Sequence, residues 1–134
     1  MILVDTSVLI DAFKGVENEK TRLFKRVLEQ SIPYGISSYT YQEVLQGAGN
    51  EREYATLKES LNTQRIYFLA EEISTYEKAA RMYYDLRRGG MTIRSAIDVL
   101  IALTAIEYGL LLLHNDRDFD LMRSQLKDLK MFEM

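Results

Sequence analysis

Apolar and polar residues alternate along the chain in blocks that predict strands, each followed by one or more helices. Short runs that are apolar throughout are typical of strands buried on both faces. Apolar residues three and four positions apart predict helices that bury one face. The predicted strands are 2–4, 34–37, 66–69, 110–113 and 130–132. The predicted helices are 38–45, 50–61, 73–88, 95–108 and 118–126, with two more between residues 6 and 32.

The first two helices are delimited by their capping and breaking residues. Thr6 or Ser7 is expected to cap the first helix, which Lys14-Gly15 ends. The second helix is expected to begin after Asn18 and to stop before Pro33. Strands that alternate with helices predict an α/β fold with a parallel sheet covered by helices on both faces. In such sheets the functional site forms beyond the carboxyl ends of the strands.

Length and composition are those of one globular domain that spans residues 1–134. Hydrophobic residues make up 47% and charged residues 28% of the chain, which has one proline and no evident linker or repeat. The chain has no cysteine, which excludes disulfides and thiolate sites and fits a cytoplasmic location. The first ten residues are not expected to form a signal peptide. Acids and a glycine interrupt the longest apolar stretch, 96–113, so no membrane span is expected either. The net charge of -3 means that any basic surface for nucleic acid must be local.

Four acids lie in or beside apolar segments, where a carboxylate is costly unless something compensates it: Asp5, Glu43, Asp98 and Asp116, with Asp118 as a fifth candidate. Asp5 and Asp116 each follow a predicted strand, so both are expected at the same edge of the sheet. Four carboxylates brought together repel one another, and a divalent cation is the simplest compensator. Each acid also has an ordinary structural interpretation as a helix cap, a solvated helix residue or a loop residue.

Other polar residues are less informative. His114 is the only histidine, and a strand-end role is favoured over a catalytic or ligand role. Arg87, Arg88 and Arg94 stand near the start of the helix that carries Asp98. They are candidates for contact with the phosphates of a nucleic acid, although solvated helix faces would explain them as well.

Four short segments together resemble a known family: Val4-Asp5-Thr6-Ser7, Gln42-Glu43-Val44, Asp98–Ala102 and Asn115–Phe119. Each is weakly specific alone, but their order and spacing are similar to those of PIN-domain ribonucleases. The resemblance is strongest to the VapC-type toxins of bacterial and archaeal toxin–antitoxin pairs. It covers essentially the whole chain.

This resemblance implies a three-layer α/β/α fold with a central, mainly parallel sheet of about five strands. It implies catalytic and metal-ligating roles for the four acids and an Mg²⁺ or Mn²⁺ cofactor, with Thr6, Ser7, Asn115 and Asp118 supporting the pocket. The implied activity is hydrolysis of RNA phosphodiester bonds by an endoribonuclease that needs no protein nucleophile. A homodimer and an antitoxin partner are implied too, with the Tyr83-Tyr84 pair as a candidate interface. The family often has Thr or Ser where this chain has His114, which affects only a hydroxyl contact.

Three alternatives remain open at the level of sequence. The chain could be an RNA-processing PIN nuclease without an antitoxin. It could also be a PIN-like domain that only binds RNA or protein, although retention of all four acids argues against this. A phosphatase or receiver domain with an aspartate nucleophile is disfavoured, because a dehalogenase-type phosphatase would need a second acid where Ser7 stands and the acids of a receiver are not visible.

Overall fold

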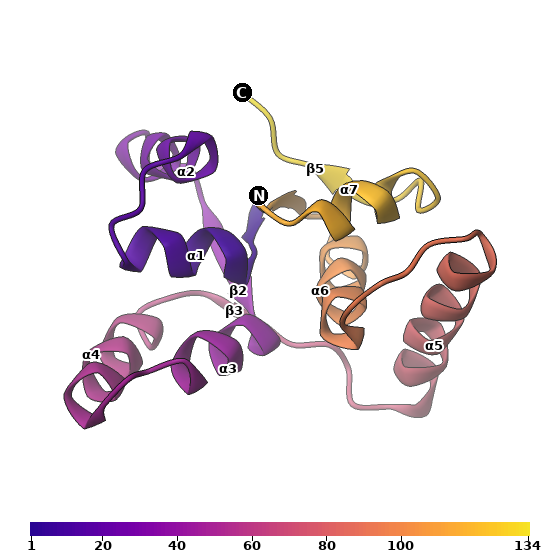
Figure 1. The fold of residues 1–134 in the computed structure, drawn as a ribbon, viewed down its shortest axis with the longest axis horizontal. Coiled ribbons are helices and arrows are strands. Elements are labelled where there is room, and N and C mark those ends of the chain that lie inside the picture. Colours follow the sequence, from indigo (N-terminus) through magenta and orange to yellow (C-terminus); the bar gives the residue numbers. More distant parts are fainter.

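The five strands form one parallel sheet in the order β3-β2-β1-β4-β5 (Figure 1). This computed structural model describes all residues, 1–134. The strands are β1 (Ile2–Val4), β2 (Tyr34–Ser37), β3 (Ile66–Tyr67), β4 (Leu111–Leu113) and β5 (Lys130–Met131). Because β1 is central and pairs with both β2 and β4, the chain reverses its direction of winding at β1. Such a point is where open α/β sheets form their sites.

Seven helices cover the sheet: α1 (Thr6–Phe13), α2 (Glu19–Glu29), α3 (Ser38–Gln46), α4 (Glu51–Leu61), α5 (Ile73–Arg88), α6 (Ala96–Glu107) and α7 (Arg117–Arg123). In Figure 1 the first four helices lie on one side of the strands and the last three on the other. The predicted three-layer α/β/α class is therefore confirmed. No helix is long and apolar enough to cross a bilayer.

The central strand supplies both halves of the core. Side chains of successive strand residues point to opposite faces of a sheet. Ile2 and Val4 accordingly pack with α1, α2 and α3, whereas Leu3 packs with α5, α6 and α7. All three side chains are at most 1% exposed. The strand that ends at Asp5 is thus fixed on both faces, which places Asp5 rigidly at the edge of the sheet.

Two predicted boundaries were wrong for reasons of tertiary structure. The strand predicted at 66–69 ends at Tyr67, because its partner β2 ends at Ser37, where α3 begins. Phe68 has no partner strand and is 62% exposed. The helix predicted at 118–126 instead spans Arg117–Arg123, and Asp116 is its N-cap.

Candidate active site

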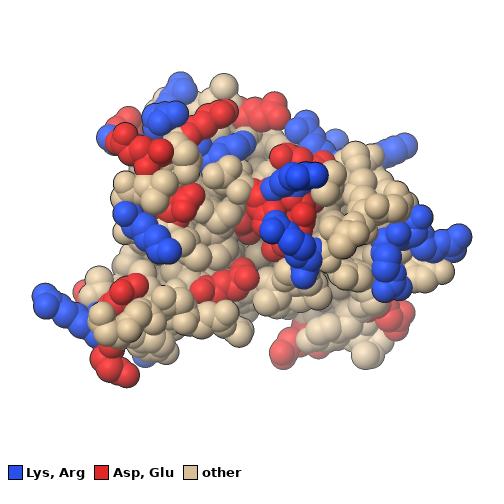
Figure 2. All heavy atoms as spheres, in the orientation of Figure 1, with Lys and Arg blue, Asp and Glu red and all other residues tan.

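The structure brings the predicted acids together beyond the carboxyl ends of β1 and β4. These strands are neighbours, and Asp5 follows one and Asp116 the other. Asp98 lies in the first turn of α6 and Glu43 lies in α3, which packs against α6. Figure 2 shows acidic side chains gathered at the centre of this face, with basic side chains beside them.

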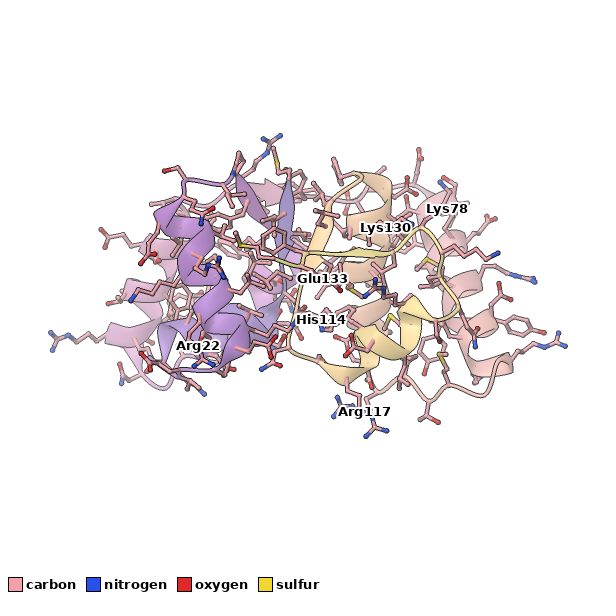
Figure 3. All side chains as sticks on the ribbon, turned by 90° about the horizontal axis from the view of Figure 1, so that it is seen from above. Arg22, Lys78, His114, Arg117, Lys130 and Glu133 are labelled. Carbon is pink, nitrogen blue, oxygen red and sulfur yellow. The ribbon has the colours of Figure 1, made fainter.

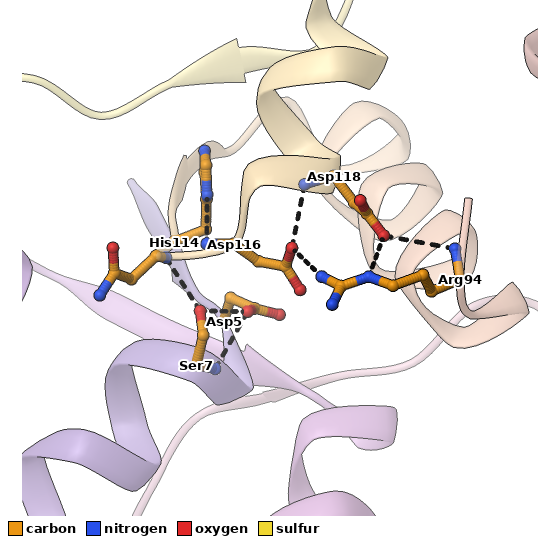
Figure 4. Close-up of polar contacts among 7 residues, drawn as sticks. Asp5, Ser7, Arg94, His114, Asp116 and Asp118 are labelled. Atoms are coloured by element: carbon orange, nitrogen blue, oxygen red, sulfur yellow. Dashed lines mark hydrogen bonds and ion pairs between the residues drawn. The ribbon is translucent and has the colours of Figure 1, made fainter. Parts of the chain in front are cut away.

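Asp5 is the N-cap of α1, which corrects the expectation that Thr6 or Ser7 caps this helix. Its Oδ2 accepts hydrogen bonds from the Ser7 backbone N–H (3.0 Å) and the Ser7 hydroxyl (2.6 Å) (Figure 4). Its Oδ1 is the one buried side-chain polar atom in the protein that has no hydrogen-bond partner. Burial is the largest cause that raises the pKa of Asp5 from 3.8 to about 6. The cap and the unpartnered group are therefore different oxygens of one carboxylate.

Asp116 has a similar arrangement at the N-terminus of α7. Its Oδ1 accepts hydrogen bonds from the Asp118 backbone N–H (2.9 Å) and from Nη2 of Arg94 (3.0 Å), and its Oδ2 has no donor. The preceding residue, Asn115, donates its backbone N–H to the Ser7 hydroxyl (2.9 Å). Asn115 therefore supports the pocket through its backbone, and its side chain is exposed.

His114 holds the loop that carries Asp116. Its Nδ1 accepts the Asp116 backbone N–H at 3.1 Å, so the proton of the neutral ring is on Nε2, 3.3 Å from Asp120 Oδ1. The ring is buried and its centroid lies 5.1 Å from that of Phe119. Burial, the largest cause, lowers the pKa of His114. The geometry is that of a strand-end residue with a supporting role, as the sequence indicated.

Glu43 and Asp98 complete the acidic group. The Thr6 hydroxyl donates to Glu43 Oε1 at 2.7 Å and also lies 3.0 Å from the buried Thr40 hydroxyl. Asp98 is half-buried, and neither of its oxygens has a hydrogen bond. Its pKa is raised to about 7, first by burial and then by repulsion from Asp5, Asp116, Glu43 and Asp118. This repulsion shows that the acids lie within electrostatic range of one another.

Three of the carboxylates share one feature: one oxygen is anchored by a local donor and the other is free. Ser7 anchors Asp5, Thr6 anchors Glu43, and the backbone of α7 with Arg94 anchors Asp116. Asp5 and Asp98, whose pKa values are raised by burial, carry carboxylate oxygens that no cation compensates. A donor set made only of oxygens suits Mg²⁺ or Mn²⁺.

The acids do not form a closed cage, since no three acidic or histidine side chains are spaced as the ligands of one shared ion. Mg²⁺ does not need such a cage, because it keeps several waters and uses one or two carboxylates directly. The orphaned Oδ1 of Asp5 supplies one such direct ligand. The residues present therefore fit a hydrated divalent ion.

Arg94 makes a contact that sequence reasoning missed. Its Nε and its backbone N–H both donate to Oδ2 of Asp118 (3.2 and 3.3 Å), while Nη2 binds Asp116. Asp118 is buried, so it is the anchor of this arginine. The pairing joins residues 24 positions apart in the sequence. The one feature of the sequence that hints at it is the position of Asp118 next to a core phenylalanine, Phe119.

Arg94 is the one arginine of the three predicted to contact RNA that the structure brings to the acids. Arg87 and Arg88 lie at the end of α5 instead. Their guanidinium carbons are 5.8 and 5.7 Å from the ring centroids of Tyr83 and Tyr84 on the same helix. Neither contacts an acid of the site.

The protein is therefore of the open-sheet α/β/α class, with acids grouped at the topological switch point, beyond the carboxyl ends of two adjacent parallel strands. The PIN domain family matches residues 2–124, and the chain belongs to this family. It is 32% identical over 123 residues to ribonuclease VapC11 of Mycobacterium tuberculosis, and this alignment covers 91% of both chains. It is 36% identical over 105 residues to ribonuclease VapC1 of Methanocaldococcus jannaschii, which covers 78% of this chain and 68% of the relative.

Solved structures show the same fold. VapBC2 from Rickettsia felis, bound to a DNA fragment from its promoter, superposes with a TM-score of 0.74 at 20% identity and 98% coverage of both chains. FitAcB from Neisseria gonorrhoeae gives a TM-score of 0.74 at 24% identity, over 99% of this chain and 97% of the other.

Proposed function

We propose that this protein is a metal-dependent endoribonuclease and the toxin of a VapBC-type toxin–antitoxin pair. The observation that carries the proposal is the convergence of Asp5, Glu43, Asp98 and Asp116, with anchored and free carboxylate oxygens. The 32% identity to a VapC ribonuclease along nearly the whole chain supports RNA as the substrate. Retention of all four acids supports catalysis over a role limited to binding.

The free oxygens of Asp5, Glu43 and Asp116, with the carboxylate of Asp98, would hold Mg²⁺ or Mn²⁺. When bound, the ion supplies positive charge that acidifies water and offsets the charge of the reacting phosphate. Ser7 and Thr6 orient two of the carboxylates through the hydrogen bonds described above. The Ser7 hydroxyl donates to Asp5 and accepts from Asn115, so it is not free to act as a nucleophile.

Replacement of Asp98 by Asn tests this function. Purified wild-type protein should cleave RNA in Mn²⁺, and a chelator should stop the reaction. Asp98→Asn should lower the cleavage rate by about 100-fold or more, because even groups that only support metal ligands contribute up to about that factor. Asp128→Asn is a matched control, since Asp128 is exposed and forms no ion pair. Equal rates for Asp98→Asn and wild type, or activity in a chelator, would contradict the proposal.

We also propose that protein partners, an antitoxin and a second copy of this chain, cover two apolar grooves. One groove, of about 750 Å³, lies between α5 and α6 and is lined by Tyr76, Tyr84 and Leu100. The other, of about 360 Å³, is lined by residues of α1, α3 and α4, including Phe13 and Leu57. The exposed apolar residues Tyr76 (53%) and Phe13 (41%) support an interaction role. Light scattering of the purified chain should give twice its mass of 15.6 kDa, and a monomer would contradict the homodimer.

A further inference from the structure

An open cavity of about 580 Å³ adjoins the acidic site. It lies between the loop that precedes α6 and the first turns of α7, and its lining includes Thr92, Arg94, Arg117 and Asp118. Two of these residues, Arg94 and Asp118, belong to the polar network around Asp116. A substrate bound at the acids therefore has this cavity immediately beside it.

Arg94 is held in a fixed position at the border between the acids and the cavity. The side chain of Asp118 is 7% exposed, whereas that of Arg94 is 71% exposed. A buried carboxylate thus fixes a guanidinium that remains open to solvent, and Nη1 of Arg94 has no partner. A guanidinium held in this way loses little conformational entropy when it binds an oxyanion.

Arg117 adds a charge that no acid of the protein compensates. It is the first residue of α7, is exposed, and forms no ion pair (Figure 3). Figure 3 shows its side chain extending outward from the start of the helix. Planar guanidinium groups bind phosphate oxygens through paired N–H donors. Arg94 and Arg117, from different elements, therefore present two such groups to one cavity.

We propose that this cavity is a phosphate-binding subsite for RNA, with Arg94 and Arg117 as its ligands. It would take a backbone phosphate next to the bond that is cleaved at the acids, a position that rests on the proposed function. Every nucleotide of an RNA strand carries a phosphate, so a strand that places one phosphate at the acids brings the next into reach of the cavity. The subsite contacts the backbone and reads no base, so it tolerates different sequences.

The test is binding of a fluorescent polyuridine strand, followed by anisotropy at several salt concentrations. Every protein in the series carries Asp98→Asn so that the RNA stays intact. Arg117→Gln should weaken the Kd about tenfold, as expected for one charged hydrogen-bonded contact. It should also reduce the slope of log Kd against log salt by about 0.7, the value for one phosphate contact on a single strand. Arg117→Lys should keep most of the slope, because it keeps the charge.

Arg123→Gln is the control for loss of a positive charge from the same helix outside the cavity; unlike Arg117, Arg123 is paired with an acid, Glu133 (3.1 Å). Equal binding by the Arg117→Gln and Arg123→Gln proteins would overturn the subsite, as would failure of the parent protein to bind polyuridine. With Asp98 intact, Arg117→Gln should raise KM for RNA and leave kcat within about twofold. If Arg117→Gln weakens binding while the wild type cleaves no RNA, the subsite stands and the nuclease proposal fails.

Discussion

Replacement of Asp5 by Asn should stabilise the metal-free protein. Asp5 is 3% exposed, and its Oδ1 has no hydrogen-bond partner, so its negative charge is buried without full compensation. Asn keeps an oxygen that can accept from the backbone N–H and hydroxyl of Ser7, which preserves the cap of α1. The substitution therefore removes the charge while retaining the local structure.

The magnitude follows from the pKa of Asp5, which burial raises from 3.8 to about 6. Below pH 3.8 the carboxyl is protonated in both the folded and the unfolded state, and there is no penalty. Between pH 3.8 and 6 the folded state binds more protons than the unfolded state, so the free energy of unfolding falls as the pH rises. Above pH 6 the full penalty of about 3 kcal/mol is present in the wild type and absent in Asp5→Asn.

Urea unfolding followed by circular dichroism, in a chelator and from pH 4.5 to pH 8, measures this difference. The Asp5→Asn protein should be more stable than the wild type by about 1 kcal/mol at pH 4.5 and by about 3 kcal/mol at pH 8. Asp128→Asn, which removes an exposed charge, should show no such trend. A difference that does not change with pH, or a less stable Asp5→Asn protein at pH 8, would refute the reasoning.

Three further predictions concern the metal, the loop and the sheet. Mn²⁺ at 100 times its Kd should stabilise the wild type by about 2.7 kcal/mol in thermal unfolding but should have little effect on Asp5→Asn. Equal stabilisation of the two proteins would show that the ion binds elsewhere. His114→Phe leaves the Asp116 backbone N–H without its acceptor and should cost about 1–3 kcal/mol in urea unfolding; His114→Gln should cost less, and equal losses would exclude this role for Nδ1. Gly35→Ala places a methyl group 2.6 Å from the Tyr67 ring and should lower stability by about 1–3 kcal/mol. An unchanged Tm would show that β3 moves to make room for the methyl group without cost.

Much of the fold and the meeting of Asp5 and Asp116 followed from local sequence, whereas the inclusion of Glu43 in the group rested on the family resemblance. The apolar runs that precede Asp5 and Asp116 are buried strands, and their direct pairing brings both acids to one edge. Asp98 stood out as a charged residue in a helix that is apolar on nearly all sides. These features depend on hydrophobic periodicity and the direction of parallel strands, both of which can be read from a single chain.

Which oxygen of each carboxylate is hydrogen-bonded and which is free could not be predicted in this way. Asp5, Thr6 and Ser7 are all favourable N-cap residue types, and the point at which β1 ends decides which of them caps α1. The hydrogen bonds between Arg94 and Asp118 join the loop before α6 to the first turn of α7, and these two segments meet only in the folded protein. Hydrogen bonds of this kind depend on atomic positions to within a fraction of an ångström, which residue patterns do not specify.

Anomalous diffraction from a crystal soaked in Mn²⁺ tests the central claim most directly, namely that these carboxylates hold a divalent cation. The account predicts an anomalous peak beyond the carboxyl ends of β1 and β4, about 2–2.2 Å from Oδ1 of Asp5 and with the free oxygen of Asp116 in its direct or water-mediated shell. A map without a peak at these acids at saturating Mn²⁺ would contradict it. So would a peak elsewhere in the protein that leaves Arg94 and the four carboxylates unchanged.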